Sequence, residues 1–112
     1  MLIFAQLFLK SGIYNQMYYS KSEYKLKGFE RSNTKNKKYD AILINIKTKK
    51  ERRIPFGDSR YQQYKDTTGL KLFSGKDHGD SIRRNSYRKR HNSDIQTDKY
   101  SAGYFSMNYL WG

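Results

Sequence analysis

The sequence predicts an α+β fold in which a small antiparallel sheet of about three strands packs with one basic helix and one short C-terminal aromatic helix. Three observations predict this architecture. Residues 23–56 contain three segments of alternating apolar and polar residues, separated by polar turns. Residues 80–91 open with a capping residue and continue with five arginines and lysines. Residues 101–111 begin with a serine and then concentrate aromatic side chains.

Residues 37–46 are the clearest strand of the predicted sheet. Ile42, Ile44 and Ile46 fall on one face of an extended chain, and Leu43 falls on the other. We therefore expect this strand to be covered on both sides and to be the most buried element of the fold.

Two further strands complete the predicted sheet. Residues 52–56 return as a strand after the polar turn at 47–51, and Pro55 is expected at an edge strand or at a strand end. Residues 23–30 form the third strand, with Gly28 at a β-bulge.

The remainder of the chain is expected to connect the sheet to the helices. Residues 59–65 are predicted to form one helical turn, and residues 66–79, which hold three glycines, an ordered loop. The basic helix is predicted to run from an N-cap at Asp80 or Ser81 to about His91.

Each predicted helix has few apolar anchors. In the basic helix they are Ile82 and Tyr87, and a polar linker at 92–99 follows. Ser101 is the predicted cap of the last helix, after which Leu110 and Trp111 are expected to fold back onto the sheet.

Residues 1–22 are predicted to be an apolar, tyrosine-rich docking segment, and residues 23–112 a single small domain. The apolar run at 1–9 lacks a basic start and ends at Lys10, well short of the ~20 residues that span a bilayer. We therefore expect neither a signal peptide nor a membrane span in this segment.

The charge balance limits the classes of partner. The 112-residue chain has 23 lysines and arginines against 10 acidic residues, a net charge of +13, which favours nucleic acid or acidic protein surfaces as partners. It has no cysteine, which excludes a disulfide scaffold and a thiolate zinc site.

The strongest binding candidates lie on the predicted basic helix: Arg83, Arg84, Tyr87, Arg88, Lys89 and Arg90. Helical spacing places Arg84, Arg88 and His91 in one stripe beside Tyr87. Such a stripe can hold phosphates or pair with carboxylates of a protein neighbour, and Tyr87 can stack on a base. A second group, predicted to be core or docking surface, consists of Tyr104, Phe105, Tyr109 and Trp111.

One cluster resembles a metal or acid–base site: Asp77, His78 and Asp80, with His91 a helix away. Aspartates next to glycine serve equally well as turn and capping residues, and the sequence has no histidine pair at i, i+4 and no phosphate-binding glycine loop. We therefore predict that the protein is not an enzyme, with no catalytic residue, no metal site and no cofactor.

A series of motifs in a fixed order carries a resemblance to a known family. In order they are residues 37–41 (Lys-Lys-Tyr-Asp-Ala), 54–58 (Ile-Pro-Phe-Gly-Asp), 61–66 (Tyr-Gln-Gln-Tyr-Lys-Asp), 77–78 (Asp-His), 83–91 (Arg-Arg-Asn-Ser-Tyr-Arg-Lys-Arg-His), 102–106 (Ala-Gly-Tyr-Phe-Ser) and 110–111 (Leu-Trp). In these motifs the chain resembles a family of short proteins of large double-stranded DNA viruses and phages that share a domain of unknown function, some of them virion components. The series covers about two-thirds of the chain, and residues 1–22 have no counterpart.

The resemblance implies a minor capsid protein or another structural protein of a virus particle, made in the host cell and located in the virion. The implied partners of the protein are the major capsid protein or further minor capsid proteins. The resemblance identifies no catalytic residues. The basic composition supports an alternative function, a nucleic-acid-binding protein packaged with the viral genome.

Overall fold

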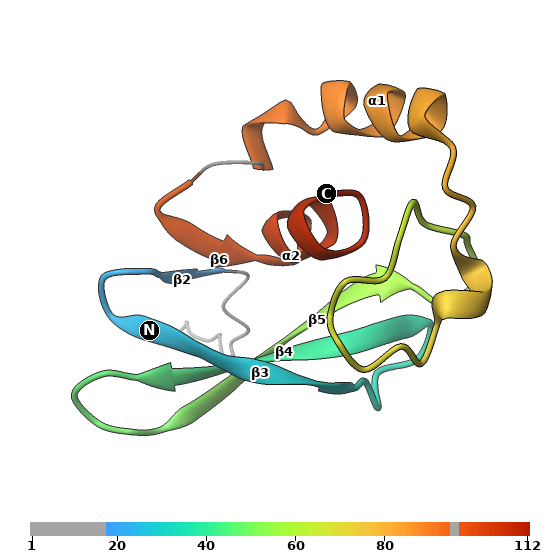
Figure 1. Ribbon diagram of the computed structural model, residues 1–112. Helices are drawn as coiled ribbons and strands as arrows, with labels where there is room; N and C mark the ends of the chain where they lie inside the picture. The colour runs from blue at the N-terminus through green and yellow to red at the C-terminus, as the bar shows by residue number, and fades with distance from the viewer. Residues whose placement is uncertain (1–17, 95–96) are drawn as a thin grey trace, which may run out of the picture.

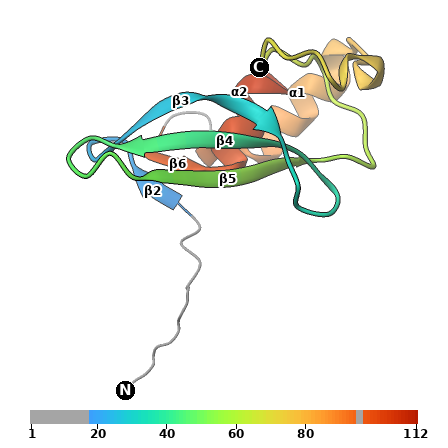
Figure 2. The same ribbon diagram turned by 90° about the horizontal axis from the view of Figure 1, so that it is seen from below.

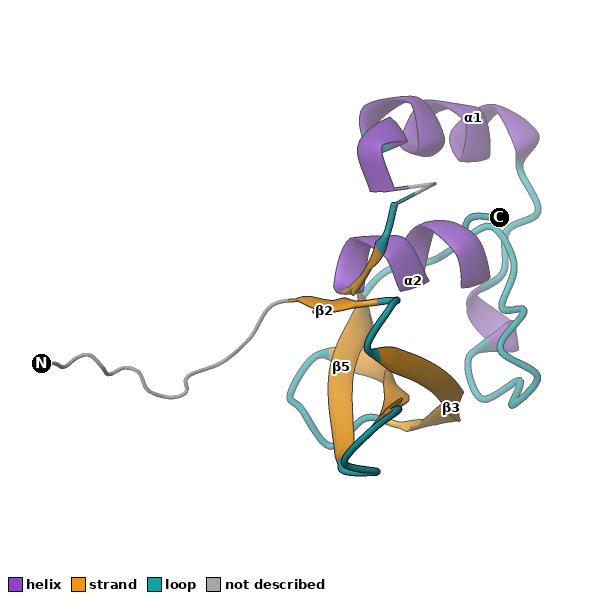
Figure 3. Cartoon of the chain, turned by 90° about the vertical axis from the view of Figure 1, so that its left-hand side faces the viewer, coloured by secondary structure: helices purple, strands orange, loops and turns teal. Residues whose placement is uncertain are grey.

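The computed structural model describes residues 18–94 and 97–112, which form an α+β fold with two antiparallel sheets and two α-helices (Figure 1). The elements are β2 (Tyr18–Ser20), β3 (Tyr24–Arg31), β4 (Lys37–Asn45), β5 (Glu51–Asp58), the 3₁₀ turn η1 (Ser74–Lys76), α1 (Ser81–Arg90), the 3₁₀ turn η2 (Asn92–Asp94), β6 (Lys99–Ser101) and α2 (Ala102–Tyr109). This confirms the predicted fold class. Helix α2 lies between the larger sheet and α1, so that the molecule has three tiers (Figure 3).

The larger sheet has the order β3-β4-β5 and matches the three predicted strands. The pairing of β3 with β4 shifts its register between Leu26 and Gly28, which confirms the predicted bulge. Pro55 lies on β5, an edge strand, where its missing N–H leaves no gap in the ladder with β4. Strand β4 is central and has six buried residues of nine, so it is the most buried element, as predicted.

One face of β4 supplies the centre of the core. Tyr39, Ala41 and Leu43 are fully buried there, together with Phe56 of β5 and Phe105 of α2. Both helices lie on the same side of the sheet (Figure 2), but β4 is buried on both of its faces, as predicted, because Lys38, Asp40 and Ile42 of the outer face are at most 7% exposed. On the outer face Ile42 is buried at 3% exposure between strand neighbours, whereas Ile46 lies beyond the end of β4 and is 40% exposed.

A second sheet, which was not predicted, joins β2 to β6 in an antiparallel pair. Tyr19 of β2 is buried in the core, so part of the predicted docking segment 1–22 belongs to the folded domain. Residues 1–17 of that segment lie outside the described residues. The predicted polar linker at 92–99 contains η2 and the first residue of β6.

The predicted helical turn at 59–65 is wrong. The Asp58 carboxylate instead accepts hydrogen bonds from the backbone N–H and the guanidinium of Arg60, which fixes a turn. Gln63 then forms an isolated parallel bridge with Asp77. Residues 66–79 are an ordered loop with one 3₁₀ turn, as expected.

Both helices begin at predicted caps. The Asp80 side chain accepts from the backbone N–H groups of Ile82 and Arg83 at the start of α1, and Ser101 accepts from Tyr104 at the start of α2. Helix α1 has no buried residue, and the prediction that Ile82 anchors it is wrong, because this side chain is 77% exposed. No helix within 18–94 and 97–112 is long and apolar enough to cross a bilayer.

Gly57 combines a positive φ with a close side-chain neighbour and provides a test of the packing between β5 and the end of α2. Its φ is +76°, and a Cβ there would lie 2.8 Å from Leu110 Cδ1. We predict that Gly57→Ala lowers the free energy of unfolding by about 2–4 kcal/mol, from left-handed backbone strain and overpacking together. Urea denaturation followed by circular dichroism measures this loss.

Gly75→Ala is the matched control, because a Cβ at Gly75 meets no atom within 4 Å and its φ is not positive. We expect this variant to change the stability by less than about 1 kcal/mol. Equal stabilities of the two variants would contradict the close approach of Leu110 to β5.

Candidate functional site

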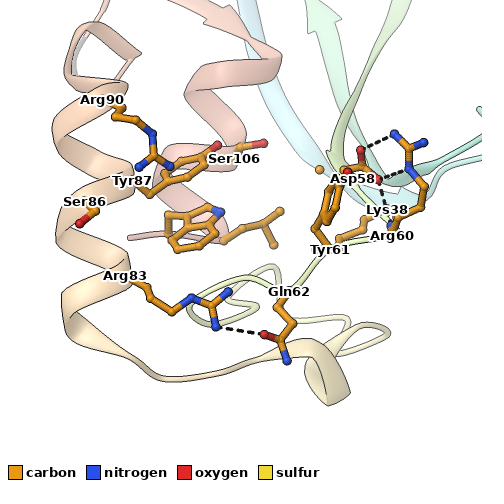
Figure 4. Close-up of a pocket in the computed structure, with 13 residues that line it drawn as sticks. Lys38, Asp58, Arg60, Tyr61, Gln62, Arg83, Ser86, Tyr87, Arg90 and Ser106 are labelled. Atoms are coloured by element: carbon orange, nitrogen blue, oxygen red, sulfur yellow. Dashed lines mark hydrogen bonds and ion pairs between the residues drawn. The ribbon is translucent and has the colours of Figure 1, made fainter.

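A groove of about 580 Å³ lies between α1, the end of β5 with its following turn, and the end of α2 (Figure 4). Its charged lining consists of Lys38, Arg60, Arg83 and Arg90 with the single carboxylate of Asp58. Its aromatic lining consists of Tyr61, Tyr87 and Trp111. The groove is therefore cationic and aromatic, a combination suited to binding anionic groups.

The guanidinium groups of the groove differ in how far they are neutralised. Arg60 forms a paired contact with Asp58, with N–O distances of 2.9 and 2.7 Å, and these hydrogen bonds hold the pKa of Asp58 well below its usual range. Arg83 donates to the neutral Gln62 Oε1 at 3.0 Å. The Arg90 guanidinium lies 5.8 Å from the centre of the Tyr87 ring. Arg83 and Arg90 thus retain their positive charge toward the groove.

Tyr87 joins α1 to the C-terminal segment. Its ring stacks on Trp111 with centroids 4.1 Å apart and planes within 6°, and His91 lies 4.5 Å away. Trp111 also contacts His78 at 5.2 Å. The expectation that the tail folds back onto the sheet holds for Leu110, which is 1% exposed beside Gly57, whereas Trp111 stacks on α1. Tyr61, at 64% exposure, is the most exposed ring in the groove.

The other predicted binding residues of α1 lie elsewhere. Arg88 Nη1 donates to the carbonyl oxygens of Met107 and Trp111, both at 3.1 Å, where it satisfies the C-terminal end of α2. Arg84 donates to the Gly112 carbonyl at 3.2 Å, and Lys89 is exposed outside the groove lining. The predicted stripe of Arg84 and Arg88 therefore faces the C-terminal segment, while Arg83, Tyr87 and Arg90 line the groove.

The C-terminal aromatic group divides in the same way between core and groove. Phe105 is fully buried, and Tyr104 and Tyr109 are half-buried against the core around it. Trp111 alone of this group lines the groove.

Beneath the groove lies a buried polar network that the sequence analysis missed. Lys38 Nζ donates to Gln63 Oε1, and Gln63 Nε2 donates to the Phe73 carbonyl at 2.8 Å and to Asp77 Oδ1 at 2.7 Å. The Tyr39 hydroxyl donates to Asp66. Lys38, Gln63 and Asp66 are each at most 6% exposed. Strand alternation places Lys38 on the face opposite Tyr39 and therefore gives no signal that its side chain is buried.

The four residues that resemble a metal or acid–base site make separate contacts, and His91 among them packs against Tyr87. Asp77 accepts from Gln63 and from the Asp66 backbone, and Asp80 caps α1. His78 Nδ1 accepts from the Asp80 backbone at 2.9 Å. Within the described ranges, no group of three potential ligands lies close enough to hold a metal ion. This geometry gives no support to a metal site at these residues.

The buried Lys38 predicts a rise in stability at alkaline pH. Burial, with a smaller contribution from Lys76, lowers its pKa from 10.5 in the unfolded chain to about 8 in the fold. Between these values the unfolded chain binds a proton that the folded chain has released, so the free energy of unfolding rises with pH. We predict a gain of about 1–2 kcal/mol between pH 8 and 9.5, measured by urea denaturation.

Two variants distinguish the rise in the free energy of unfolding caused by Lys38 from the effect of losing any one lysine charge. Lys38→Met should remove the gain, whereas Lys50→Met, at an exposed lysine in the turn between β4 and β5, should retain it. A pH profile of Lys38→Met parallel to that of the unmodified chain would contradict the lowered pKa.

The stack between Trp111 and Tyr87 predicts that the tail contributes to stability. Because Trp111 is half-buried, Trp111→Ala should cost about 2 kcal/mol, roughly half the loss of a fully buried tryptophan. Lys50→Ala, in an exposed turn, should cost less than about 0.5 kcal/mol. Thermal melts compare the two variants, and equal melting temperatures would show that the tail is not part of the folded unit.

The described geometry therefore assembles a cationic and aromatic groove above a buried polar network. Comparisons with protein-family models, curated proteins and solved structures find no match to this chain.

Proposed function

We propose that this chain is a minor capsid protein or another structural protein of a virus particle, which binds neighbouring capsid proteins through the groove. The observation that carries the proposal is the composition of that groove. Arginine, tyrosine and tryptophan are enriched at the energetic centres of protein interfaces, and they line this groove from three separate elements. The resemblance to viral proteins described above supports the same function. The proposal involves no catalysis and no cofactor.

The charge distribution supports acidic protein surfaces as partners. The chain carries a net charge of +13, and within the described residues neither Arg83 nor Arg90 pairs with a carboxylate. An acidic patch on a capsid protein would neutralise these guanidinium groups with bidentate hydrogen bonds. The basic residues of α1 then act at an interface rather than as a solvated surface.

Nucleic-acid binding is the second candidate, because four cationic side chains line one groove. Phosphates can occupy the same guanidinium groups. However, Tyr87 is already stacked on Trp111 and in contact with His91, which weakens the expectation that it stacks on a base. The structural role in the virion is therefore the favoured function, and packaging with the viral genome is the alternative.

Incorporation into purified particles tests the proposal. We expect to find the unmodified chain in particles in fixed stoichiometry with the capsid proteins. Incorporation of the double variant Arg83→Ser, Arg90→Ser should fall several-fold, because both charges that face the partner are removed. The control is Lys47→Ser, Lys50→Ser, which removes the same charge from exposed residues at the opposite end of the β4–β5 hairpin. Quantitative mass spectrometry of the particles measures both.

Particles that lack the genome distinguish the two candidates. A capsid component remains in genome-free particles at the same ratio to the capsid proteins. A protein packaged through nucleic acid is lost with the genome. Abundance in infected cells together with absence from purified particles would refute both functions.

A further inference from the structure

Arg83 and Arg90 line one wall of the groove, and the helix fixes the distance between their backbone positions. They lie seven residues apart on α1, which is two helical turns and a rise of about 10 Å. The helix that holds them is capped by Asp80 at its start and fixed by the Tyr87 stack and the Arg88 hydrogen bonds along its length. Two cationic groups are thus presented at a spacing that the helix sets.

The opposite wall offers an aromatic surface rather than a second pair of charges. Arg60 is neutralised by Asp58, and Tyr61 beside it exposes 64% of its surface. Figure 4 shows Arg83 and Arg90 on α1 facing the turn that carries Tyr61 and Gln62. An occupant therefore meets two guanidinium groups on one side and an exposed tyrosine ring on the other.

An extended acidic segment in the polyproline II conformation fits this arrangement. Polyproline II has three residues per turn and a rise of about 3.1 Å, so side chains at i and i+3 share one side about 9 Å apart. That spacing matches the two arginines. In a β-strand the same two positions point to opposite faces. Aromatic-lined grooves bind polyproline II segments because such segments lose little conformational entropy on binding.

We infer that the groove binds an extended acidic segment of a partner protein, with two carboxylates at i and i+3 that pair with Arg83 and Arg90. This inference rests on the proposed function as a protein-binding virion component. It adds the chemistry and the spacing of the motif that is recognised. The partner's carboxylates complete ion pairs that the described residues of this chain leave open.

Synthetic peptides test the inference on the full chain. The probe is an acetylated, amidated Pro-Glu-Pro-Pro-Glu-Pro peptide, and titration calorimetry at low salt measures its affinity. Two controls are Pro-Gln-Pro-Pro-Gln-Pro, which removes the charge, and Pro-Pro-Glu-Glu-Pro-Pro, which keeps the charge and changes the spacing. We expect affinity to fall about tenfold or more for the glutamine peptide and several-fold for the adjacent-glutamate peptide.

Protein variants locate the binding in the groove. Arg83→Ser, Arg90→Ser should lose tenfold or more in affinity for the probe, while Lys47→Ser, Lys50→Ser should change it less than about twofold. A matching far-UV circular dichroism spectrum of the groove variant establishes that α1 remains folded. Equal affinities for the three peptides, or equal losses in the two variants, overturn the inference. Arginine-dependent binding of a short DNA duplex without binding of the probe also overturns it and favours the nucleic-acid alternative.

The particle-incorporation experiment and the peptide-binding experiment test separate claims, so that either claim can be refuted without the other. Normal incorporation of the groove variant into particles leaves the virion function standing and refutes the groove as the contact. If the protein binds the probe with the expected dependence on spacing but is absent from particles, the inferred binding of acidic segments is supported and the virion function is refuted.

Discussion

The fold depends on the buried hydrogen-bond network that joins β4 to the loop after β5. Lys38 and Tyr39 are consecutive residues of the central strand, and they hold Gln63 and Asp66 of the loop respectively. Each polar group buried there has a partner, so removal of any one leaves another unsatisfied at a cost of about 1–3 kcal/mol. A buried ammonium whose direct partner is a neutral amide costs free energy, and the pKa of Lys38 falls accordingly.

This network sets the position of the groove. The loop at 59–80 has few buried apolar side chains, with Phe73 half-buried beside Tyr39, so polar contacts determine where it lies. The loop ends at Asp80, which caps α1, and its His78 contacts Trp111. The central strand, the loop, the helix and the tail therefore form one continuous chain of contacts, and the groove is the space that they enclose.

The sequence predicts those elements that are decided by local patterns. Alternation identifies β3, β4 and β5, and short-range hydrogen bonding identifies the caps Asp80 and Ser101, because these signals involve residues within a few positions of one another. The two short strands β2 and β6 pair residues about eighty positions apart and leave no such local pattern.

The sequence predicts only part of the candidate site, because the site combines a local pattern with contacts between distant residues. The sequence indicates that α1 is cationic, but a helix without an apolar stripe gives no sign of which face meets the domain. Tertiary contacts assign Arg84 and Arg88 to the C-terminal carbonyl groups, and Arg83 and Arg90 to the groove. Lys38 lies in a run of lysines, and its burial depends on a loop more than twenty residues away.

The bulge at Gly28 and the proline at position 55 lie on the two edge strands of the larger sheet, one on each side. An open, regular edge is a template on which a strand of another chain can add. The bulge twists one edge away from regular pairing, and the proline removes a donor from the other. Charged residues within two positions of these features, Lys27 on β3 and Arg53 on β5, further disfavour such addition. The sheet is thereby protected against edge-to-edge aggregation when copies are crowded together.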